Sequence, residues 1–400
     1  MPMYHALGEM PRKRHTQFRA PDGKLYVEEV FGLEGFDGPE SILYHRHSPA
    51  RIKHARPFEP RPITEWQPPE WAHRHLRFAD FPPQGDPIQG RQPFMYNNDI
   101  TMWYVRPTES QKTFYRNGMG DEIIFVHEGT GVLRTMFGPI PYREGDYLVI
   151  PRGTIYQMEM AEGSAPQRHL VLETPGHFSI PKDFRNQYGQ LLEHAPYYHR
   201  DLRLPQAVEY HDEQGEFELL VRVNNGFQTY ELDHHPFDVI GWDGYCYPFA
   251  FNIWDYEPKA GRLHQPPPAH LTWRGPGFVV CSFMPRMLDW DKDAVVVPYH
   301  HSNLDSEEVL YYFNGNFASR KGIDISSITL HPSGVPHGPQ PGLDEKTLGM
   351  HWTDEAAVMV DTFRPLKLAA AAEQWDDPSY KYSWYEGHPE GTDGGPMTVE

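Results

Sequence analysis

Hydrophobic positions in this chain fall into many short runs rather than into long helical stripes. The runs are rich in β-branched and aromatic residues, and glycine or proline closes many of them, which is typical of short strands joined by turns. The predicted strands are DEIIFVHEG (121–129), GDYLVIP (145–151), HLVLETP (169–175), FELLVRV (217–223), GFVVCSFMP (277–285), EEVLYYFNG (307–315) and EAAVMVDTF (355–363). Helical patterning is sparse, and its best candidate, KLAAAAEQW (367–375), is predicted to form a late surface helix. The pattern therefore predicts a mostly β fold with few short helices.

Two segments of the chain share one template. In each, a glutamate opens a strand, a glycine closes it seven residues later, and a subsequent strand leads into a P-x-G-x-x-[YH] motif. The first copy spans residues 120–156 and ends on Tyr156, and the second spans 308–337 and ends on His337. An internal repeat of this length indicates a duplicated domain.

The shared template resembles the cupin fold, an antiparallel jelly-roll barrel whose interior carries a metal on histidine and glutamate side chains. In the second copy, His301-x-Asn303 followed by Glu308 is similar to the first cupin motif, and the segment ending at His337 is similar to the second. The resemblance implies a metal bound by His301, Glu308 and His337. The first copy has Tyr156 at the last ligand position and no similar histidine motif before its glutamate.

We therefore expect two cupin-like (jelly-roll) barrels in one chain. Residues 1–255 are predicted to form an N-terminal β domain with a degenerate, metal-free barrel, and residues 256–400 a C-terminal catalytic cupin domain. Two neutral imidazoles and one carboxylate leave adjacent coordination positions open, as a non-haem iron(II) oxygenase requires. This ligand set has a single negative charge, so a ferrous ion keeps a net positive charge that favours an anionic substrate. We predict Fe(2+) as the cofactor.

Three blocks narrow the resemblance to one enzyme family. The run HPFDVIGWDGYCYPFAFN (235–252) resembles a signature segment of the homogentisate 1,2-dioxygenases, and PYHHSN with SE (298–307) and LHPSGVPHGP (330–339) are similar to two further blocks of that family in the same order. The resemblance implies cleavage of a para-dihydroxylated aromatic ring by dioxygen, next to the ring's side chain. Homogentisate would give maleylacetoacetate, a step of tyrosine and phenylalanine catabolism, and the family implies a homo-trimer or hexamer.

The same resemblance implies roles for individual residues. His264 matches a catalytic histidine that orients or deprotonates the ring hydroxyl, and histidine suits this role because its pKa lies near neutral pH. His331 matches a second active-site histidine, which we expect to contact the metal shell or the substrate. The arginine and tyrosine that the family places near the substrate carboxylate are absent here. Tyr312, Arg320 and Lys321 are the candidates for that contact, and Tyr312 is predicted to bind substrate.

Two ligand positions have a neighbouring rival. Glu307 and Glu308 point to opposite faces of a strand, so only one can reach the metal. The glutamate-to-glycine spacing shared with the first copy favours Glu308, whereas counting from His301 in the manner of the family favours Glu307. His300 is the corresponding rival of His301. We predict Glu308 and His301.

The composition and the hydrophobic pattern argue against nucleic-acid binding, a membrane-spanning helix and secretion. The net charge of −19 argues against nucleic-acid binding, which depends on clustered lysine and arginine. No apolar stretch approaches the roughly 18 residues that a membrane-spanning helix needs, and the first residues lack the apolar core of a signal peptide. Cys246 and Cys281 lie in hydrophobic runs and are expected to be buried free thiols in a reducing compartment, the cytoplasm.

Two alternatives stay open. One is a dioxygenase that acts on gentisate or another hydroquinone, or a cupin isomerase; gentisate enzymes typically use three histidines, which a glutamate ligand argues against. The other is a non-enzymatic bicupin binding protein with a vestigial site. Metal analysis separates these classes, because an oxygenase should bind about one iron per chain.

Overall fold

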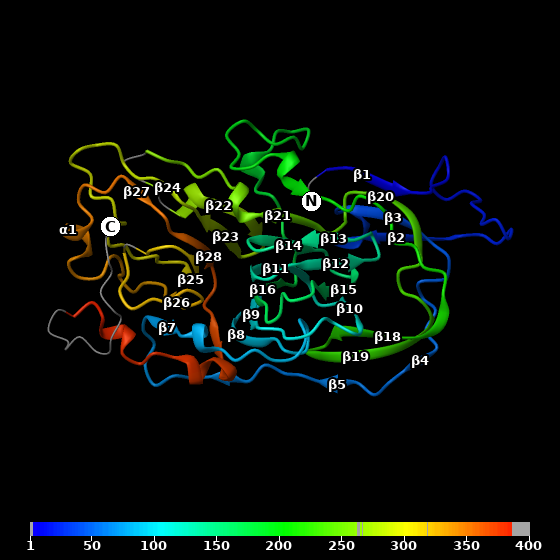
Figure 1. Cartoon of the computed structure of the whole chain (residues 1–400), viewed down its shortest axis with the longest axis horizontal. Helices are drawn as coiled ribbons and strands as arrows, with labels where there is room; N and C mark the ends of the chain where they lie inside the picture. The colour runs from blue at the N-terminus through cyan, green and yellow to red at the C-terminus, as the bar shows by residue number, and fades with distance from the viewer. Residues whose placement is uncertain (1–2, 262–264, 266, 318, 386–400) are drawn as a thin grey trace.

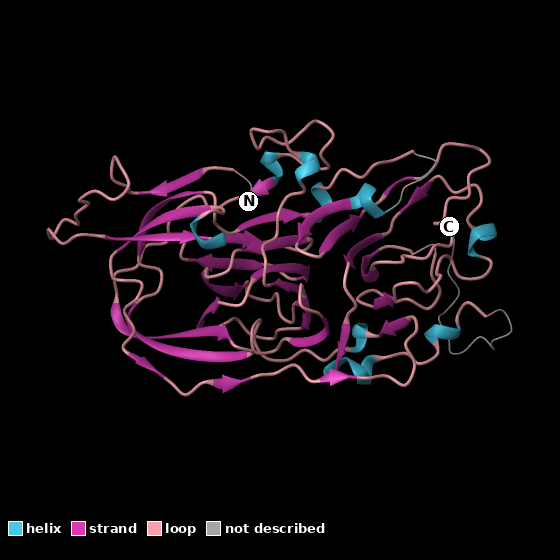
Figure 2. Cartoon of the chain, turned by 180° about the vertical axis from the view of Figure 1, so that it is seen from behind, coloured by secondary structure: helices cyan, strands magenta, loops and turns pink. Residues whose placement is uncertain are grey.

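The computed structural model describes residues 3–261, 265, 267–317 and 319–385. Strands form the body of the molecule, and the helical segments are short pieces between them (Figures 1 and 2). The described residues contain the α-helix α1 (Leu343–Lys346). They also contain short 3-10 segments elsewhere in the chain, at Glu34–Phe36, Phe78–Asp80, Lys182–Phe184, His199–Asp201, Ile253–Asp255, Pro267–His270, Ala370–Trp375 and Tyr380–Tyr382. Within the described ranges, none of the helices reaches the length and apolarity that a membrane span requires.

Two sheets face each other in the N-terminal half. The nine-stranded sheet contains, in spatial order, β17 (Leu202–Arg203), β21 (Phe249–Asn252), β14 (Asp146–Ile150), β11 (Asp121–Glu128), β16 (Arg168–Thr174), β9 (Thr101–Val105), β8 (Gln92–Tyr96), β29 (Lys367–Ala369) and β6 (Glu65–Trp66). The eight-stranded sheet contains β13 (Ile140–Tyr142), β12 (Gly131–Thr135), β15 (Ile155–Met160), β10 (Phe114–Asn117), β18 (Gln214–Val223), β19 (Gly226–His234) and β4 (His54–Ala55), with β5 (Glu59–Pro60) also on β19. Ile124, Leu148 and Val171 belong to the apolar core between them.

The C-terminal half is built on one six-stranded sheet. Its strands are β22 (Leu271–Gly275), β23 (Phe278–Phe283), β28 (Ala356–Thr362), β25 (Glu307–Asn314), β26 (Ile328–His331) and β7 (Arg74–Leu76), and a two-stranded ribbon of β24 (Arg286–Met287) and β27 (Trp352–Thr353) lies beside it. Side chains alternate between the faces of a strand. One face of this sheet therefore packs against the nine-stranded sheet. Its residues Val309, Tyr311 and Val358 lie with Phe125 and Tyr147 in the largest described core of the protein. The two halves share this core.

Each half also lends a strand to the other. Leu76 of β7, from the N-terminal half, pairs with Ile328 in the C-terminal sheet, and Leu368 of β29, near the C-terminus, pairs with Met95 in the nine-stranded sheet. The predicted surface helix over 367–375 is wrong for this reason. The backbone of its first three residues is committed to strand pairing, and the rest forms a 3-10 turn in which Ala372 is fully buried.

A small sheet holds part of the HPFDVIGW segment. It consists of β1 (His5–Gly8), β20 (Val239–Gly244), β3 (Glu40–His45) and β2 (Val27–Gly32). The Nδ1 atom of His45 lies 2.8 Å from an oxygen of Asp238, and its Nε2 atom lies 2.9 Å from an oxygen of Glu29. Burial alone would lower the pKa of the His45 imidazole, but the two carboxylates raise it to about 9. This motif residue, Asp238, therefore anchors a buried ion pair.

The observed structure confirms the predicted fold class, which is mostly β with two related jelly-roll-like halves and few short helices. Cys246 and Cys281 are buried free thiols, as their apolar surroundings predict.

Candidate metal centre

A cavity of about 550 Å³ opens on the face of the C-terminal sheet opposite to the core that the two halves share. Because β25 alternates, Glu308, Leu310 and Tyr312 line this cavity while the residues between them face the shared core. Glu308 is buried at the start of the strand. The strand period therefore brings a carboxylate into an otherwise largely apolar space.

Backbone pairing places two histidines beside this carboxylate. The amide of His301 donates to the carbonyl of His337 (2.8 Å), and the amide of His337 donates back to the carbonyl of His301 (2.9 Å). Gly334 forms the preceding turn with a φ of +73°, a conformation that favours glycine, and its amide donates to the Asn303 carbonyl (2.6 Å). The P-x-G-x-x-H motif thus folds its histidine back against the loop that carries the other one.

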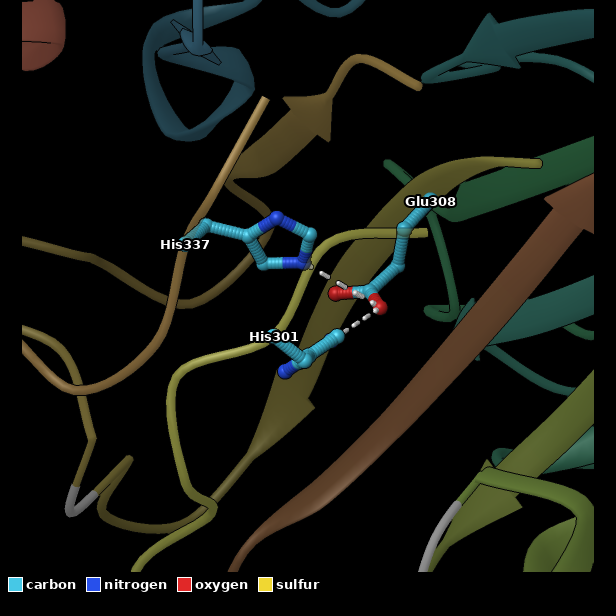
Figure 3. A group of neighbouring side chains, drawn as sticks. All are labelled: His301, Glu308 and His337. Carbon is cyan, nitrogen blue, oxygen red and sulfur yellow. Dashed lines mark ion pairs between the residues drawn. The ribbon is translucent and has the colours of Figure 1, made fainter. Parts of the chain in front are cut away.

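The three side chains converge on one point (Figure 3). The Nε2 atoms of His301 and His337 each lie 3.6 Å from the same oxygen of Glu308, and the nearest ligand atoms of the three residues all lie within 4.8 Å of one another. Burial would raise the pKa of Glu308, but the imidazoles that face it hold the pKa of its carboxyl well below the usual range. The Glu308 carboxylate that faces it raises the pKa of the His301 imidazole.

The donor atoms suit a metal ion. Each imidazole has its Nδ1 atom 3.1 Å from a backbone carbonyl, that of Tyr299 for His301 and that of Val335 for His337. An Nδ1–H that donates there leaves the Nε2 lone pair free. Both Nε2 atoms are buried and lack a hydrogen-bond partner among the described residues. Ligand atoms about 2.1 Å from an ion lie about 3.0–3.4 Å apart. The two 3.6 Å separations from Glu308 are close to this spacing, whereas atoms as far as 4.8 Å apart would have to move together around an ion.

His331 lies behind the carboxylate. Its Nδ1 atom is 3.0 Å from the other oxygen of Glu308, and its Nε2 atom is 3.3 Å from the hydroxyl of Tyr380. Burial lowers the pKa of His331 to about 3, so the ring is neutral and its Nδ1–H donates to the carboxylate. Such outer hydrogen bonds fix the orientation of a ligand. His331 thus contacts Glu308, one of the three candidate ligands, and it is not among the described residues that line the cavity; its contact with substrate stays a prediction.

The rival positions lie elsewhere. Glu307 points away from the cavity and accepts a hydrogen bond from the Leu366 amide (2.6 Å), and His300 is exposed at the surface. Tyr312 lines the cavity, with its hydroxyl 3.0 Å from that of Thr329. His264, the predicted catalytic histidine, lies outside the described residues.

Sequence reasoning missed Asp361 and did not choose Arg320. Asp361 stands directly opposite Glu308 on β28, lines the cavity, and has a buried Oδ1 atom without a hydrogen-bond partner among the described residues. Arg320 is buried in the cavity wall and donates to the carbonyls of Ser319 (3.1 Å) and Gly338 (2.8 Å). Within the described part of the chain, no carboxylate forms an ion pair with Arg320. Asp361 could be assigned to the site only from the register of β28 on β25, which pairs it with Glu308, and a single sequence does not give that register.

The first copy of the repeat shows what replaces the ligands. Tyr115 is paired with Tyr156 across two strands, as His301 is bridged to His337, and Tyr115 precedes Glu122 by the same seven residues that separate His301 from Glu308. The Tyr156 hydroxyl donates to Glu122 (2.6 Å).

A guanidinium supplies the positive charge at this position. Arg91 forms a buried ion pair with Glu122 and donates to the Tyr156 hydroxyl (3.1 Å). The first copy therefore keeps the acidic strand of the template but balances its carboxylate with a protein cation.

Comparison with known proteins gives the relationship. A family model described as the homogentisate 1,2-dioxygenase N-terminal region matches residues 84–253. A provisionally named dioxygenase of Saccharolobus solfataricus is 44% identical over 388 residues, which cover 96% of this chain and 100% of that protein. The chain belongs to the homogentisate 1,2-dioxygenase-like family.

A more distant family member and a solved structure also align with this chain. The homogentisate 1,2-dioxygenase of Emericella nidulans is 26% identical over 374 residues, covering 83% of this chain and 78% of that enzyme. A solved structure of a cupin 2 conserved barrel domain protein from Leptotrichia buccalis aligns with 74% of this chain and 99% of its own at 10% identity, with a TM-score of 0.33. This homogentisate 1,2-dioxygenase-like chain thus matches the first relative over nearly all of its residues and the second over most of them at lower identity.

Proposed function

We propose that this chain is a ring-cleaving dioxygenase that binds ferrous iron on His301, Glu308 and His337. The observation that carries the proposal is the convergence of these three side chains at a cavity, with both imidazole Nε2 atoms left without a partner among the described residues. The iron would supply a Lewis acid and adjacent open positions for an aromatic hydroxyl and dioxygen. The reaction would break one ring carbon–carbon bond and place both oxygen atoms in the product.

The surrounding residues have separate tasks in this proposal. Arg320 offers a buried guanidinium without an anionic partner among the described residues, which suits a substrate carboxylate. Asp361 offers a carboxyl oxygen that can accept a hydrogen bond from a ring hydroxyl. Tyr312 lines the wall near Arg320 and positions the ring. His264, by its family resemblance, would handle the proton of the hydroxyl that binds the metal.

Homogentisate is the proposed substrate on the strength of the family, with gentisate or another hydroquinone as the alternative. The test is to load the purified full chain anaerobically with ferrous iron, measure iron per chain, and then record oxygen uptake with homogentisate, gentisate and unsubstituted hydroquinone. One iron per chain and uptake with homogentisate would support the proposal. Uptake with another ring would change the substrate, and bound iron without any uptake would favour a binding protein.

His264 has its own test. His264→Ala should reduce turnover strongly while one iron per chain stays bound, because the residue is proposed to act on the substrate proton. Loss of iron in this variant would instead make it a ligand. We also propose a homo-trimer or hexamer in the cytoplasm, which light scattering of the purified protein would test for the assembly.

A further inference from the structure

The floor of the cavity has a polar row and an apolar row. Across the sheet, Glu308 of β25 stands beside Asp361 of β28, and one step further along these strands Leu310 stands beside Met359. Each residue two positions along a strand is displaced by about 6.7 Å on the same face. The apolar row therefore begins directly next to the proposed metal position.

The apolar row crosses four strands. From Leu310 it continues through Met359 to Cys281 of β23 and Leu271 of β22, which the strand register places in line. Leu310, Met359 and Leu271 line the cavity, Cys281 lies beneath them, and Phe283 adds an aromatic ring on the same face. Three strand spacings of about 4.8 Å make this floor about 14 Å long, which is more than a single benzene ring covers.

The remaining space agrees with a larger ligand. A volume of about 550 Å³ lies in the middle of the range of about 300–1,000 Å³ for sites that bind ligands of drug size. Arg286, which also lines the cavity, is already neutralised by Glu355 (2.9 Å) and donates to Gln265 (2.9 Å). Arg274 is paired with Asp183 outside the floor. Among the described lining residues, the arginine without a carboxylate is Arg320, beside the metal position. Among the lining residues that the structure describes, a second anionic group far from the metal thus meets no unpaired cation.

We infer, on the basis of the proposed ring-cleaving function and in favour of its alternative substrate, another hydroquinone, that the substrate of this chain is a para-dihydroxylated ring with an uncharged apolar substituent, either an alkyl chain or a second ring. The ring binds beside Glu308 and Asp361, and the substituent lies across Leu310, Met359 and Phe283. Each buried methylene of the substituent removes apolar surface from water, which corresponds to about a fourfold gain in binding.

The experiment uses the iron-loaded full chain and a series of hydroquinones with one alkyl group, from methyl to hexyl, with homogentisate for comparison. The ratio kcat/KM from oxygen uptake should rise about fourfold per methylene over the first members, and the longer members should exceed homogentisate. A flat or falling series, or a preference for homogentisate over every alkyl member, would overturn the inference.

Variants separate the floor from general effects. Met359→Gln, which keeps the length of the side chain, should bring the gain per methylene close to onefold. Leu310→Phe should shift the preferred chain length downward and serves if the first variant does not fold. Met287→Gln is the matched control, because Met287 is half-exposed and lies outside the described cavity lining. An unchanged gain in Met359→Gln protein with normal iron content would contradict the assignment.

Failure of the proposed function gives a different result. If no ring supports oxygen uptake, anaerobic equilibrium dialysis of methyl- and hexylhydroquinone against the same protein still tests the floor. Tighter binding of the hexyl compound would retain the apolar site and reject only the ring cleavage, and equal binding would reject both.

Discussion

The two adjacent glutamates of β25 provide the sharpest test of the metal centre. Glu308 and Glu307 are both buried carboxylates at the start of the same strand, but they point to opposite faces. Glu308 faces two imidazoles at 3.6 Å, whereas Glu307 accepts the Leu366 amide at 2.6 Å and burial raises its pKa. Glutamine has the same shape as glutamate, so Glu308→Gln and Glu307→Gln change charge and hydrogen bonding without opening a cavity.

The two substitutions should affect different properties: Glu308→Gln the affinity for iron, and Glu307→Gln the stability of the fold. Removal of one outer hydrogen bond to a ligand typically reduces metal affinity about 10–100-fold, and removal of a charged ligand should exceed this. We therefore expect Glu308→Gln to lose at least about 100-fold in iron affinity, about 2.7 kcal/mol. Glu307→Gln should keep the affinity within about threefold but lower the free energy of unfolding by about 1–3 kcal/mol, because a hydrogen bond to a charged buried acceptor becomes a neutral one.

Iron affinity is measured anaerobically by competition with a coloured ferrous chelator, and the free energy of unfolding by denaturant titration of the metal-free proteins. The unmodified chain and both variants are compared at one pH. Wild-type iron affinity in Glu308→Gln would refute the ligand assignment. An equally large loss in Glu307→Gln would mean that the effect comes from disturbance of the strand rather than from coordination.

Other predictions concern the surroundings of the site and the rest of the fold. His331→Asn should weaken iron binding about 10–100-fold in the same chelator competition, because it removes the hydrogen bond that orients Glu308; unchanged affinity would contradict that role. Arg91→Met should lower the free energy of unfolding by about 3–5 kcal/mol, because it leaves Glu122 buried and unpaired. The double variant Arg91→Met with Glu122→Leu should recover most of this loss in denaturant titration. A double variant no more stable than the single one would contradict the role of Arg91 in balancing the Glu122 carboxylate. The pKa of His45 is raised from 6.5 to about 9 in the folded chain, so its contribution to stability is full below pH 6.5 and lost as pH rises through 9. Thermal unfolding between pH 6 and 9.5 should show this decline, and His45→Gln should flatten it; a parallel decline in both proteins would rule out His45 as its source.

Much of this architecture follows from local patterns in the sequence. The runs of β-branched and aromatic residues predict the strands because side-chain alternation is a local property. The repeat aligns two segments of the same template, so it places Glu308 at the start of its strand and His337 after the turn. In the structure, the Nε2 atom of His337 lies 3.6 Å from the Glu308 carboxylate. Tyr156, which the repeat sets in the place of His337, indeed contacts the equivalent glutamate.

Features that depend on pairing between distant segments could not be predicted in this way. Asp361 meets Glu308 only through the register of β28 on β25, and the partner of His331 depends on the register of β26. The alanine-rich stretch at 367–375 has good helix formers, but Leu368 is fully buried and pairs with Met95 in a sheet. Tertiary pairing overrides local propensity at such positions.

The exchange of β7 and β29 has a consequence for how this protein responds to its ligands. The sheet that carries the candidate metal centre is completed by residues 74–76, and the sheet of the other half is extended by residues 367–369, with one core between them. Neither half has a complete set of strands without the other, so a fragment cut near residue 255 would expose apolar surface and a bare sheet edge. Occupation of the cavity should therefore stabilise the whole polypeptide as one cooperative unit, and a stability probe placed in the N-terminal half should register ligand binding in the C-terminal half.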